Sequence, residues 1–223
     1  MRIRCKPWAR PELEACPFFI AEPAANKGHW NEVFSNDKPI WLELGCGKGG
    51  FASQAVVHWP DVNFIAIDIK NEMLVLAKRK IEAALQEHHM TAEQVRVMIF
   101  NISHMEEAFG EHDRIDRIFI NFCNPWPKGK HKKRRLTHPR QLVQYKPFLK
   151  GELWFKTDDD ELFEETLEYL DECGFEVTYL TRDLHHSDFT ENLQTEHERM
   201  FTEEGKNIKF LIARQKTAEG EMP

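Results

Sequence analysis

A glycine-rich segment is the part of this sequence whose residue types most clearly indicate chemistry. Gly45, Gly47, Gly49 and Gly50 directly follow a short apolar run, and a stretch with helical spacing comes after them. Glycines let the backbone turn tightly and approach a ligand, and a helix N-terminus presents free amide groups. The segment therefore predicts a site for a nucleotide-like ligand. Gly45-x-Gly47-x-x-Gly50 fits the dinucleotide fingerprint, whereas Gly45-x-Gly47-x-Gly49 fits the loop of S-adenosylmethionine-dependent enzymes.

Polar residues at the ends of the first three apolar runs narrow the choice of ligand. Asp68 ends the second run, where its carboxylate suits the ribose of either cofactor. Glu43 discriminates better, because an acid inside the first run would repel a pyrophosphate but suits the ammonium end of a methionine moiety. Asn101 follows the third run and is expected to meet the adenine ring. The alternatives are that Glu43 points to solvent, that Asp68 caps the next helix and that Asn101 is a turn residue.

The fourth apolar run ends in Asn121-Phe-Cys-Asn124-Pro125-Trp126-Pro127. Ligands of open α/β sheets bind beyond the carboxyl ends of the strands, so we expect Asn124 beside the glycine loop. The two prolines stiffen the turn, and Trp126 offers a flat face for packing or base stacking. An amide or acid followed by Pro-x-x recurs where methyltransferases present a nitrogen acceptor to the methyl group. The alternative is a rigid loop with a half-buried Trp126.

A basic run follows immediately. Residues 128–135 carry six formal positive charges in eight positions, although the whole chain has a net charge of −7. Without them the chain has 24 basic against 37 acidic residues, so positive charge is concentrated beside the proposed site. Such a run can be a solvated loop, but its place at a strand tip favours contact with nucleic-acid phosphates. The candidate phosphate-binding residues are Lys128, Lys130, Lys132, Lys133, Arg134 and Arg135.

The composition excludes several classes of protein. With 41% hydrophobic and 30% charged residues, the chain of 223 residues is expected to fold as a globular protein. Its five cysteines are odd in number and form no C-x-x-C, so we predict neither disulfides nor a thiolate zinc site, and a cytoplasmic location. No signal peptide or membrane span is expected. The adjacent His185 and His186 lack a matching acidic or Cys cluster, so no metal site is predicted.

Apolar runs alternate with helix-spaced segments from residue 40 onward, as in parallel strands joined by crossover helices. Strands are expected at 40–44, 63–67, 96–100, 117–122, 152–155, 175–180 and 208–213. Helices are expected at 72–88, at 159–173, from about residue 139 and near 196–202. The long connection before the last run allows an antiparallel last strand. We predict one doubly wound α/β domain over residues 40–223, preceded by an extended, proline-rich N-terminal arm at 1–39.

Taken together, these motifs resemble the bacterial tRNA (guanine-N7-)-methyltransferases of the TrmB type. The resemblance covers nearly the whole chain, and the Pro-Trp-Pro-Lys segment with its basic run is its most specific part. Its motifs are Glu43-Leu-Gly-x-Gly-Lys-Gly49, Asn121-Phe-x-x-Pro-Trp-Pro-Lys128, His131-x-Lys-Arg-Arg-Leu-Thr137, Phe155-Lys-Thr-Asp158 and Thr195-Glu-His-Glu198.

The resemblance implies a Rossmann-like class I methyltransferase fold: a single, mostly parallel seven-stranded sheet, its last strand antiparallel, flanked by helices. It implies methyl transfer from S-adenosylmethionine to N7 of a guanosine in tRNA, in the variable loop, by a monomer or homodimer. The implied cofactor-binding residues are Glu43, Gly45, Gly47, Asp68, Asn101 and Asn124. The implied substrate-binding residues are Lys128, Asp158, Thr195, Glu196, His197 and Glu198.

Two positions depart from the commonest pattern of that family. Asn124 stands where many relatives have Asp, and an amide cannot act as a general base. Guanine N7 carries a lone pair and no proton, so its attack needs no base, and Asn124 is predicted to be catalytic by orienting the reactants. His197 stands where an aromatic such as Tyr is frequent and would alter stacking. Asp158 and Glu198 are expected to accept hydrogen bonds from guanine, with an N-cap as the alternative for Asp158.

Two other functions remain open from the sequence. An NAD(P)-dependent oxidoreductase would explain the six-residue glycine fingerprint and Asp68, but it leaves the basic run and Pro-Trp-Pro unexplained. A catalytically inactive RNA-binding protein is suggested by Asn124 in place of the more usual acid.

Overall fold

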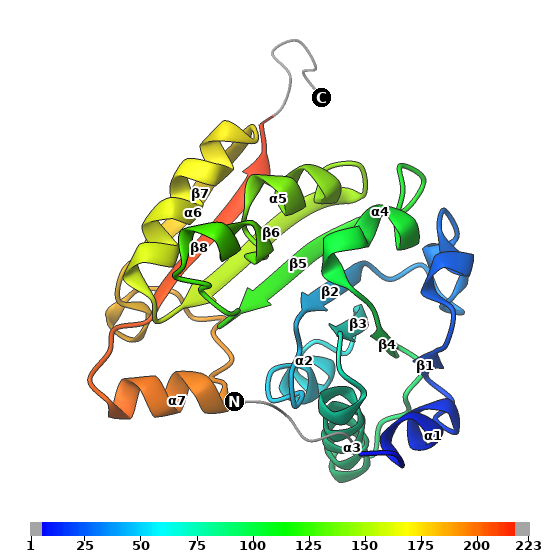
Figure 1. The fold of residues 1–223 in the computed structure, drawn as a ribbon. Coiled ribbons are helices and arrows are strands. Elements are labelled where there is room, and N and C mark those ends of the chain that lie inside the picture. The colour runs from blue at the N-terminus through cyan, green and yellow to red at the C-terminus, as the bar shows by residue number, and fades with distance from the viewer. Residues whose placement is uncertain (1–5, 217–223) are drawn as a thin grey trace.

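Alternating strands and helices build one twisted sheet covered on both faces (Figure 1). The computed structural model describes residues 6–216, and within them the sheet has eight strands in the order β1-β4-β3-β2-β5-β6-β8-β7. The strands are β1 (Phe19–Ile20), β2 (Ile40–Leu44), β3 (Asn63–Asp68), β4 (Val95–Ile99), β5 (Ile115–Asn121), β6 (Leu149–Thr157), β7 (Phe175–Thr181) and β8 (Lys209–Gln215). The strands β1 to β6 pair in parallel, and β8 runs antiparallel to β6 and β7, which confirms the expected topology.

The helices connect these strands. They are α1 (Ala9–Glu14), α2 (Ala52–His58), α3 (Asn71–Glu87), α4 (Met105–Ala108), α5 (Pro139–Tyr145), α6 (Asp160–Glu172) and α7 (Glu196–Glu203). Short 3-10 turns add η1 (Pro23–Asn26), η2 (Trp30–Glu32), η3 (Ile102–His104), η4 (Gly129–Arg134) and η5 (Leu184–His186). The four helices predicted from the sequence are confirmed as α3, α5, α6 and α7.

Two hydrophobic cores lie on opposite faces of the sheet because side chains alternate along each strand. Phe64 and Ala66 of β3 pack in the core that includes α1, α2 and α3. Ile65 and Ile67 of the same strand pack in the core that includes α4, α5 and α6. The central strands are thus buried on both faces, which explains their continuous apolar sequence.

The structure corrects two predictions about the N-terminal part. The sheet has eight strands and not seven, because Phe19 and Ile20 pair with β4 as a two-residue strand too short to show a sequence period. Residues 6–39 are also not simply extended, since they contain α1, η1 and η2. Leu13 packs in the core beside α3, and Trp30 is buried in the opposite core. Residues 1–5 of the predicted arm lie outside the described part of the chain.

The carboxyl ends of the parallel strands meet at one edge of the sheet, as they must when the strands share a direction. In Figure 1 α7 lies beyond this edge, where α2 and α3 also begin, directly after β2 and β3. No helix among residues 6–216 is both long and apolar enough to cross a bilayer.

Candidate active site

The glycine loop between β2 and α2 forms the floor of the site. Gly45, Gly47 and Gly49 have φ values of 79°, 55° and 75°, a region that side chains with a Cβ rarely enter. The amides of Gly45 and Cys46 both donate to the carbonyl of Ile67 at 2.9 Å. A Cβ on Gly49 would lie 2.6 Å from Cα of Ala77, so α3 can approach the loop only because this residue is glycine.

Asp68 at the end of β3 holds the same loop in place. Its Oδ2 accepts from the amide of Gly47 at 3.0 Å, and its Oδ1 accepts from the amide of Lys70 at 2.9 Å. Burial raises the pKa of this carboxyl above its usual value. The N-cap of α3 is Lys70, so Asp68 does not cap that helix as the alternative interpretation required.

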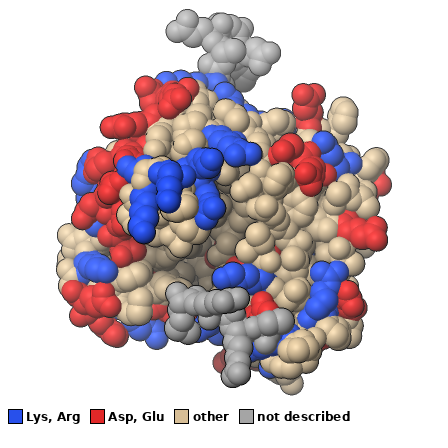
Figure 2. Space-filling model, in the orientation of Figure 1, with Lys and Arg blue, Asp and Glu red and all other residues tan. Residues whose placement is uncertain are grey.

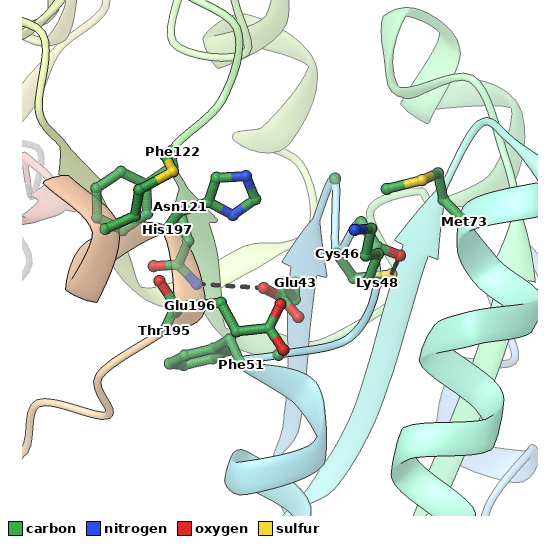
Figure 3. A pocket seen from close by; sticks show the side chains of 14 residues that line it. Glu43, Cys46, Lys48, Phe51, Met73, Asn121, Phe122, Thr195, Glu196 and His197 are labelled. Carbon is green, nitrogen blue, oxygen red and sulfur yellow. Dashed lines mark hydrogen bonds between the residues drawn. The ribbon is translucent and has the colours of Figure 1, made fainter. Parts of the chain in front are cut away.

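Two cavities of about 420 and 480 Å³ lie side by side at this edge and share Gly45 and Phe122. Figure 3 shows that the first lies between the glycine loop and α7. Its lining residues are Glu43, Gly45, Cys46, Gly47, Lys48, Gly50, Phe51, Met73, Asn121, Phe122, Thr195, Glu196, His197 and Met200. The second is lined by Gly45, Asp68, Ile69, Asn101, Ile102, Ser103, Phe122, Cys123, Asn124, Trp126, Arg134 and Leu136. All six predicted cofactor-binding residues therefore line this double cavity.

Glu43 is the buried acid of the first cavity, with 3% of its surface exposed. Its Oε1 accepts from Nδ2 of Asn121 at 3.3 Å, as the dashed line in Figure 3 shows. Its Oε2 is buried and has no hydrogen-bond partner in the structure. Desolvation raises the pKa of Glu43 to about 7, against the opposing effects of Asn121 and Lys156. A buried carboxylate with an unused oxygen fits a cationic ligand group, and Glu43 does not point to bulk solvent as the alternative supposed.

The loop of residues 121–127, here called the acceptor loop, turns sharply past the end of β5. Phe122 and Trp126 have φ values of 49° and 43°, a strained conformation for residues with side chains. Oδ1 of Asn124 accepts from the amide of Trp126 at 3.0 Å, which fixes the orientation of the side-chain amide. Oδ1 of Asn101 likewise accepts from the amide of Ser103 at 3.1 Å, so Asn101 is a turn residue that also lines the second cavity.

The basic run forms η4 above this cavity, and Figure 2 shows its Lys and Arg side chains gathered beside a hollow. The guanidinium of Arg134 lies 5.1 Å from the centroid of the Trp126 ring. All six cations were predicted to bind phosphates, but two of them pair with carboxylates of α6. Lys132 pairs with Glu161 at 2.7 Å, and Arg135 is buried and pairs with Glu165. The exposed cations are Lys128, Lys130, Lys133 and Arg134.

The four predicted substrate residues at the start of α7 have different surroundings in the structure. Thr195 and Glu198 form a capping box, in which Oγ1 of Thr195 accepts from the amide of Glu198 at 3.1 Å. Glu196 and His197 line the first cavity together with Thr195, and the ring of His197 stacks on Phe122 at 6.4 Å between centroids.

Glu198, predicted to contact substrate, is not among the residues that line the cavity, and its carboxylate pairs inside the protein. Its Oε2 lies 2.5 Å from Nζ of Lys156, and its Oε1 accepts from Nδ2 of Asn192 at 2.7 Å. Oε1 also lies 3.1 Å from Nε2 of His185. With its side chain 0% exposed and both oxygens occupied, Glu198 holds α7 to β6 in this structure.

Asp158 lines neither cavity. Its carboxylate lies 3.3 Å from Nζ of Lys206, and its backbone carbonyl accepts from Nζ of Lys209 at 3.0 Å. The N-cap alternative for Asp158 is wrong, because Asp159 caps α6 by accepting from the amide of Leu162 at 2.7 Å.

Sequence reasoning missed several lining residues. Asn121 lies within a motif already noted, and its place at a strand end was a usable signal. Phe122 lines both cavities, but its positive φ cannot be read from a Phe in the sequence. Met73 and Met200 come from helices packed against the glycine loop and have no local signal.

Comparison with known proteins shows the family of the chain. Residues 37–211 match the family model described as "Putative methyltransferase". The chain is 61% identical to the tRNA (guanine-N(7)-)-methyltransferase of Clostridium beijerinckii, over 96% of this chain and 98% of that protein. It is 56% identical to the protein of the same name from Acetivibrio thermocellus, over 97% of this chain and 100% of that protein.

Solved structures of low sequence identity share the fold. One described as an antibiotic-related methyltransferase has a TM-score of 0.59 at 16% identity, covering 83% of this chain and 92% of that chain. The 16S rRNA methyltransferase KamB has a TM-score of 0.58 at 11% identity, covering 84% and 93%.

The mostly parallel sheet with its antiparallel last strand has the Rossmann-like fold of these structures, and the family model matched by residues 37–211 places the chain among the methyltransferases. The curated relatives place it more narrowly: the chain belongs to the tRNA (guanine-N(7)-)-methyltransferase family. This membership decides against the NAD(P)-dependent oxidoreductase that the glycine spacing alone had left open.

Proposed function

We propose that this protein transfers a methyl group from S-adenosylmethionine to N7 of a guanosine in tRNA. The relatives' names state methylation of guanine N7 in tRNA for those proteins, and the cofactor is part of the proposal. The observation that carries the proposal is Glu43, a buried acid that lines the first cavity and whose Oε2 has no hydrogen-bond partner in the described structure. A methionine ammonium group is a cation of suitable size for this position. A pyrophosphate would instead be repelled by the carboxylate.

The rest of the cofactor would occupy both cavities. Glu43 would hold the methionine ammonium group, and the ribose and adenine would lie beside Asp68 and Asn101 in the second cavity. Gly45 lines both cavities, so its missing Cβ leaves room where the two halves of the ligand would join. When bound, the cofactor supplies an electrophilic methyl group on a sulfonium.

The protein's part in the reaction would be to position the guanine. Guanine N7 has no proton to lose, and its neighbour O6 is a hydrogen-bond acceptor on the same edge. Because Oδ1 of Asn124 already accepts from Trp126, the side-chain NH₂ group of Asn124 is left to donate to O6 or to the cofactor. Glu196, which faces the first cavity, would replace Glu198 as acceptor for the ring N–H and amino group. Orientation of this kind can lower a barrier by about 7 to 11 kcal/mol.

The exposed cations of η4 would bind the tRNA backbone, with the variable loop carrying the target guanosine. A base within folded RNA must be turned out to reach a cavity, which costs about a few kcal/mol of unstacking. Phosphate contacts by Lys128, Lys130, Lys133 and Arg134 would offset this cost.

The test is to incubate the purified protein with labelled S-adenosylmethionine and unmodified tRNA, digest the RNA and identify the labelled nucleoside. The expected product is N7-methylguanosine, mapped by sequencing to one position in the variable loop. No methylated guanosine, despite measurable binding of tRNA, would instead indicate the inactive RNA-binding protein. The Asn124→Asp variant is expected to retain activity, because the residue orients and does not remove a proton.

A further inference from the structure

The Arg135 guanidinium lies buried between the acceptor loop and α6, with its side chain 0% exposed. Its Nε donates to the carbonyl of Pro125 at 2.6 Å. One terminal nitrogen pairs with Glu165, and the other lies 3.5 Å from Oε1 of Glu161. All three nitrogens of the fork therefore face acceptors of the protein. A phosphate could reach Arg135 only if this arrangement came apart.

A second cation anchors the same segment. Nζ of Lys132 pairs with Glu161 at 2.7 Å and also with Glu165. The hydroxyl of Tyr169 donates to Glu165 at 3.1 Å, which further fixes that carboxylate. Figure 2 shows acidic side chains gathered over α6 directly beside the basic group of η4. The basic run is thus divided, with one part bound to α6 and the other exposed to solvent.

The contact with Pro125 matters because of the backbone around it. The positive φ values of Phe122 and Trp126 place strain on both sides of this carbonyl. Strained residues keep such conformations only where the surrounding structure holds them. Arg135 supplies a rigid donor at this point, and Pro125 directly follows Asn124.

We propose that Arg135 and Glu165 are positioning residues of the methyl transfer, which fix the acceptor loop and through it Asn124, and that neither binds RNA phosphates. The activity readout rests on the proposed function. A shift of about 1 Å in a reacting group can lower a rate by about 100-fold, so loss of this restraint affects turnover more than RNA affinity.

The experiment compares four variants with the wild-type protein in thermal unfolding, in kcat for tRNA methylation and in the salt dependence of tRNA binding. Arg135→Gln removes the charge, and Arg135→Lys keeps the charge without the fork. The double variant Arg135→Met with Glu165→Met replaces the buried pair by apolar side chains. Glu164→Gln is the matched control, because Glu164 is on the same helix but pairs with Arg182 at the surface.

We expect the double variant to unfold near the wild-type temperature, since apolar replacement of a buried ion pair is often neutral or stabilising. Its kcat is expected to fall about 10- to 100-fold, because the Pro125 carbonyl has lost its donor. Arg135→Lys is expected to lower kcat in the same range. Arg135→Gln is expected to leave the salt slope of tRNA binding unchanged. The control Glu164→Gln is expected to change neither kcat nor this salt slope.

Two results would overturn the proposal. A salt slope reduced by about 0.7 to 0.9 in Arg135→Gln would show a phosphate contact. A folded double variant with wild-type kcat would show that the pair only stabilises the fold. If the double variant does not fold, a wild-type kcat in Arg135→Lys would likewise show that the pair only stabilises the fold. Failure of the wild type to methylate tRNA would refute the proposed function, while the salt slope would still test Arg135.

Discussion

Replacement of Glu43 by Gln is expected to stabilise the free protein and to weaken its binding of S-adenosylmethionine. The Glu43 carboxyl has a pKa of about 7 in the folded chain, raised by desolvation from 4.5. At 1.36 kcal/mol for each pH unit, the difference corresponds to about 3 kcal/mol. This is the free energy by which burial disfavours the ionised carboxyl in the free site.

The size of this stability difference depends on pH. Below pH 4.5 the carboxyl is protonated in the folded and unfolded states, so it contributes no pH dependence. Between pH 4.5 and about 7 the unfolded chain ionises while folded Glu43 stays protonated, so the free energy of unfolding falls as pH rises. Above about pH 7 the free energy of unfolding no longer changes with the ionisation of Glu43 and stays at its lowered value. Glu43→Gln should therefore be more stable than the wild type by about 1 to 3 kcal/mol near pH 8, and nearly equal to it near pH 4.

Urea unfolding at these two pH values measures the stability difference, and isothermal titration near pH 8 measures cofactor affinity. A hydrogen bond to a charged group contributes about 1.5 to 3 kcal/mol, so the variant is expected to bind about 10- to 100-fold more weakly. In the wild type alone, affinity should fall as pH drops below about 7, because Glu43 must give up its proton to meet an ammonium group. A Gln variant with wild-type affinity, or with lower stability near pH 8, would refute this account of Glu43.

Three further predictions concern the loop, the α7 anchor and the RNA surface. Gly49→Ala should lower the melting temperature, because its Cβ would lie 2.6 Å from backbone at φ +75°, whereas Gly129→Ala, with open space around it, should not. Lys156→Met should cost about 3 to 5 kcal/mol in urea unfolding, since it leaves the Glu198 charge buried without its cation; an unchanged stability would contradict that role. Lys133→Gln should weaken tRNA binding and reduce the salt slope by about 0.7 to 0.9 without changing cofactor affinity, and an unchanged slope would exclude a phosphate contact.

The residues that local sequence signals predicted to bind the cofactor all line the two cavities. Gly45, Gly47 and Gly49 all adopt positive φ, and Glu43 and Asp68 stand at the ends of the strands β2 and β3 that precede turns. A turn or a strand end depends mainly on neighbouring residues, so such features can be read from a short stretch of sequence. The two-residue strand at Phe19 is the exception, because it depends on pairing with β4 and not on a pattern of its own.

The orientation of charged side chains near the substrate site could not be predicted, because charge alone does not show where a side chain points. Arg135 was expected to meet phosphate but pairs with Glu165, 30 residues away in the chain. Glu198 was expected to meet guanine but pairs with Lys156, 42 residues away. Both outcomes depend on which helix packs over which strand, and no local pattern encodes that contact.

The sequence by itself determined the class of fold, the family and the position of the glycine loop, since strand alternation, helix spacing and glycine conformation are properties of adjacent residues. Only the tertiary structure decided which charged side chains form ion pairs inside the protein and which are exposed at the site. Burial of a charged group is tolerated only beside a partner, and the partner is brought there by folding. The six cations of the basic run are for this reason divided between anchoring the loop and facing solvent.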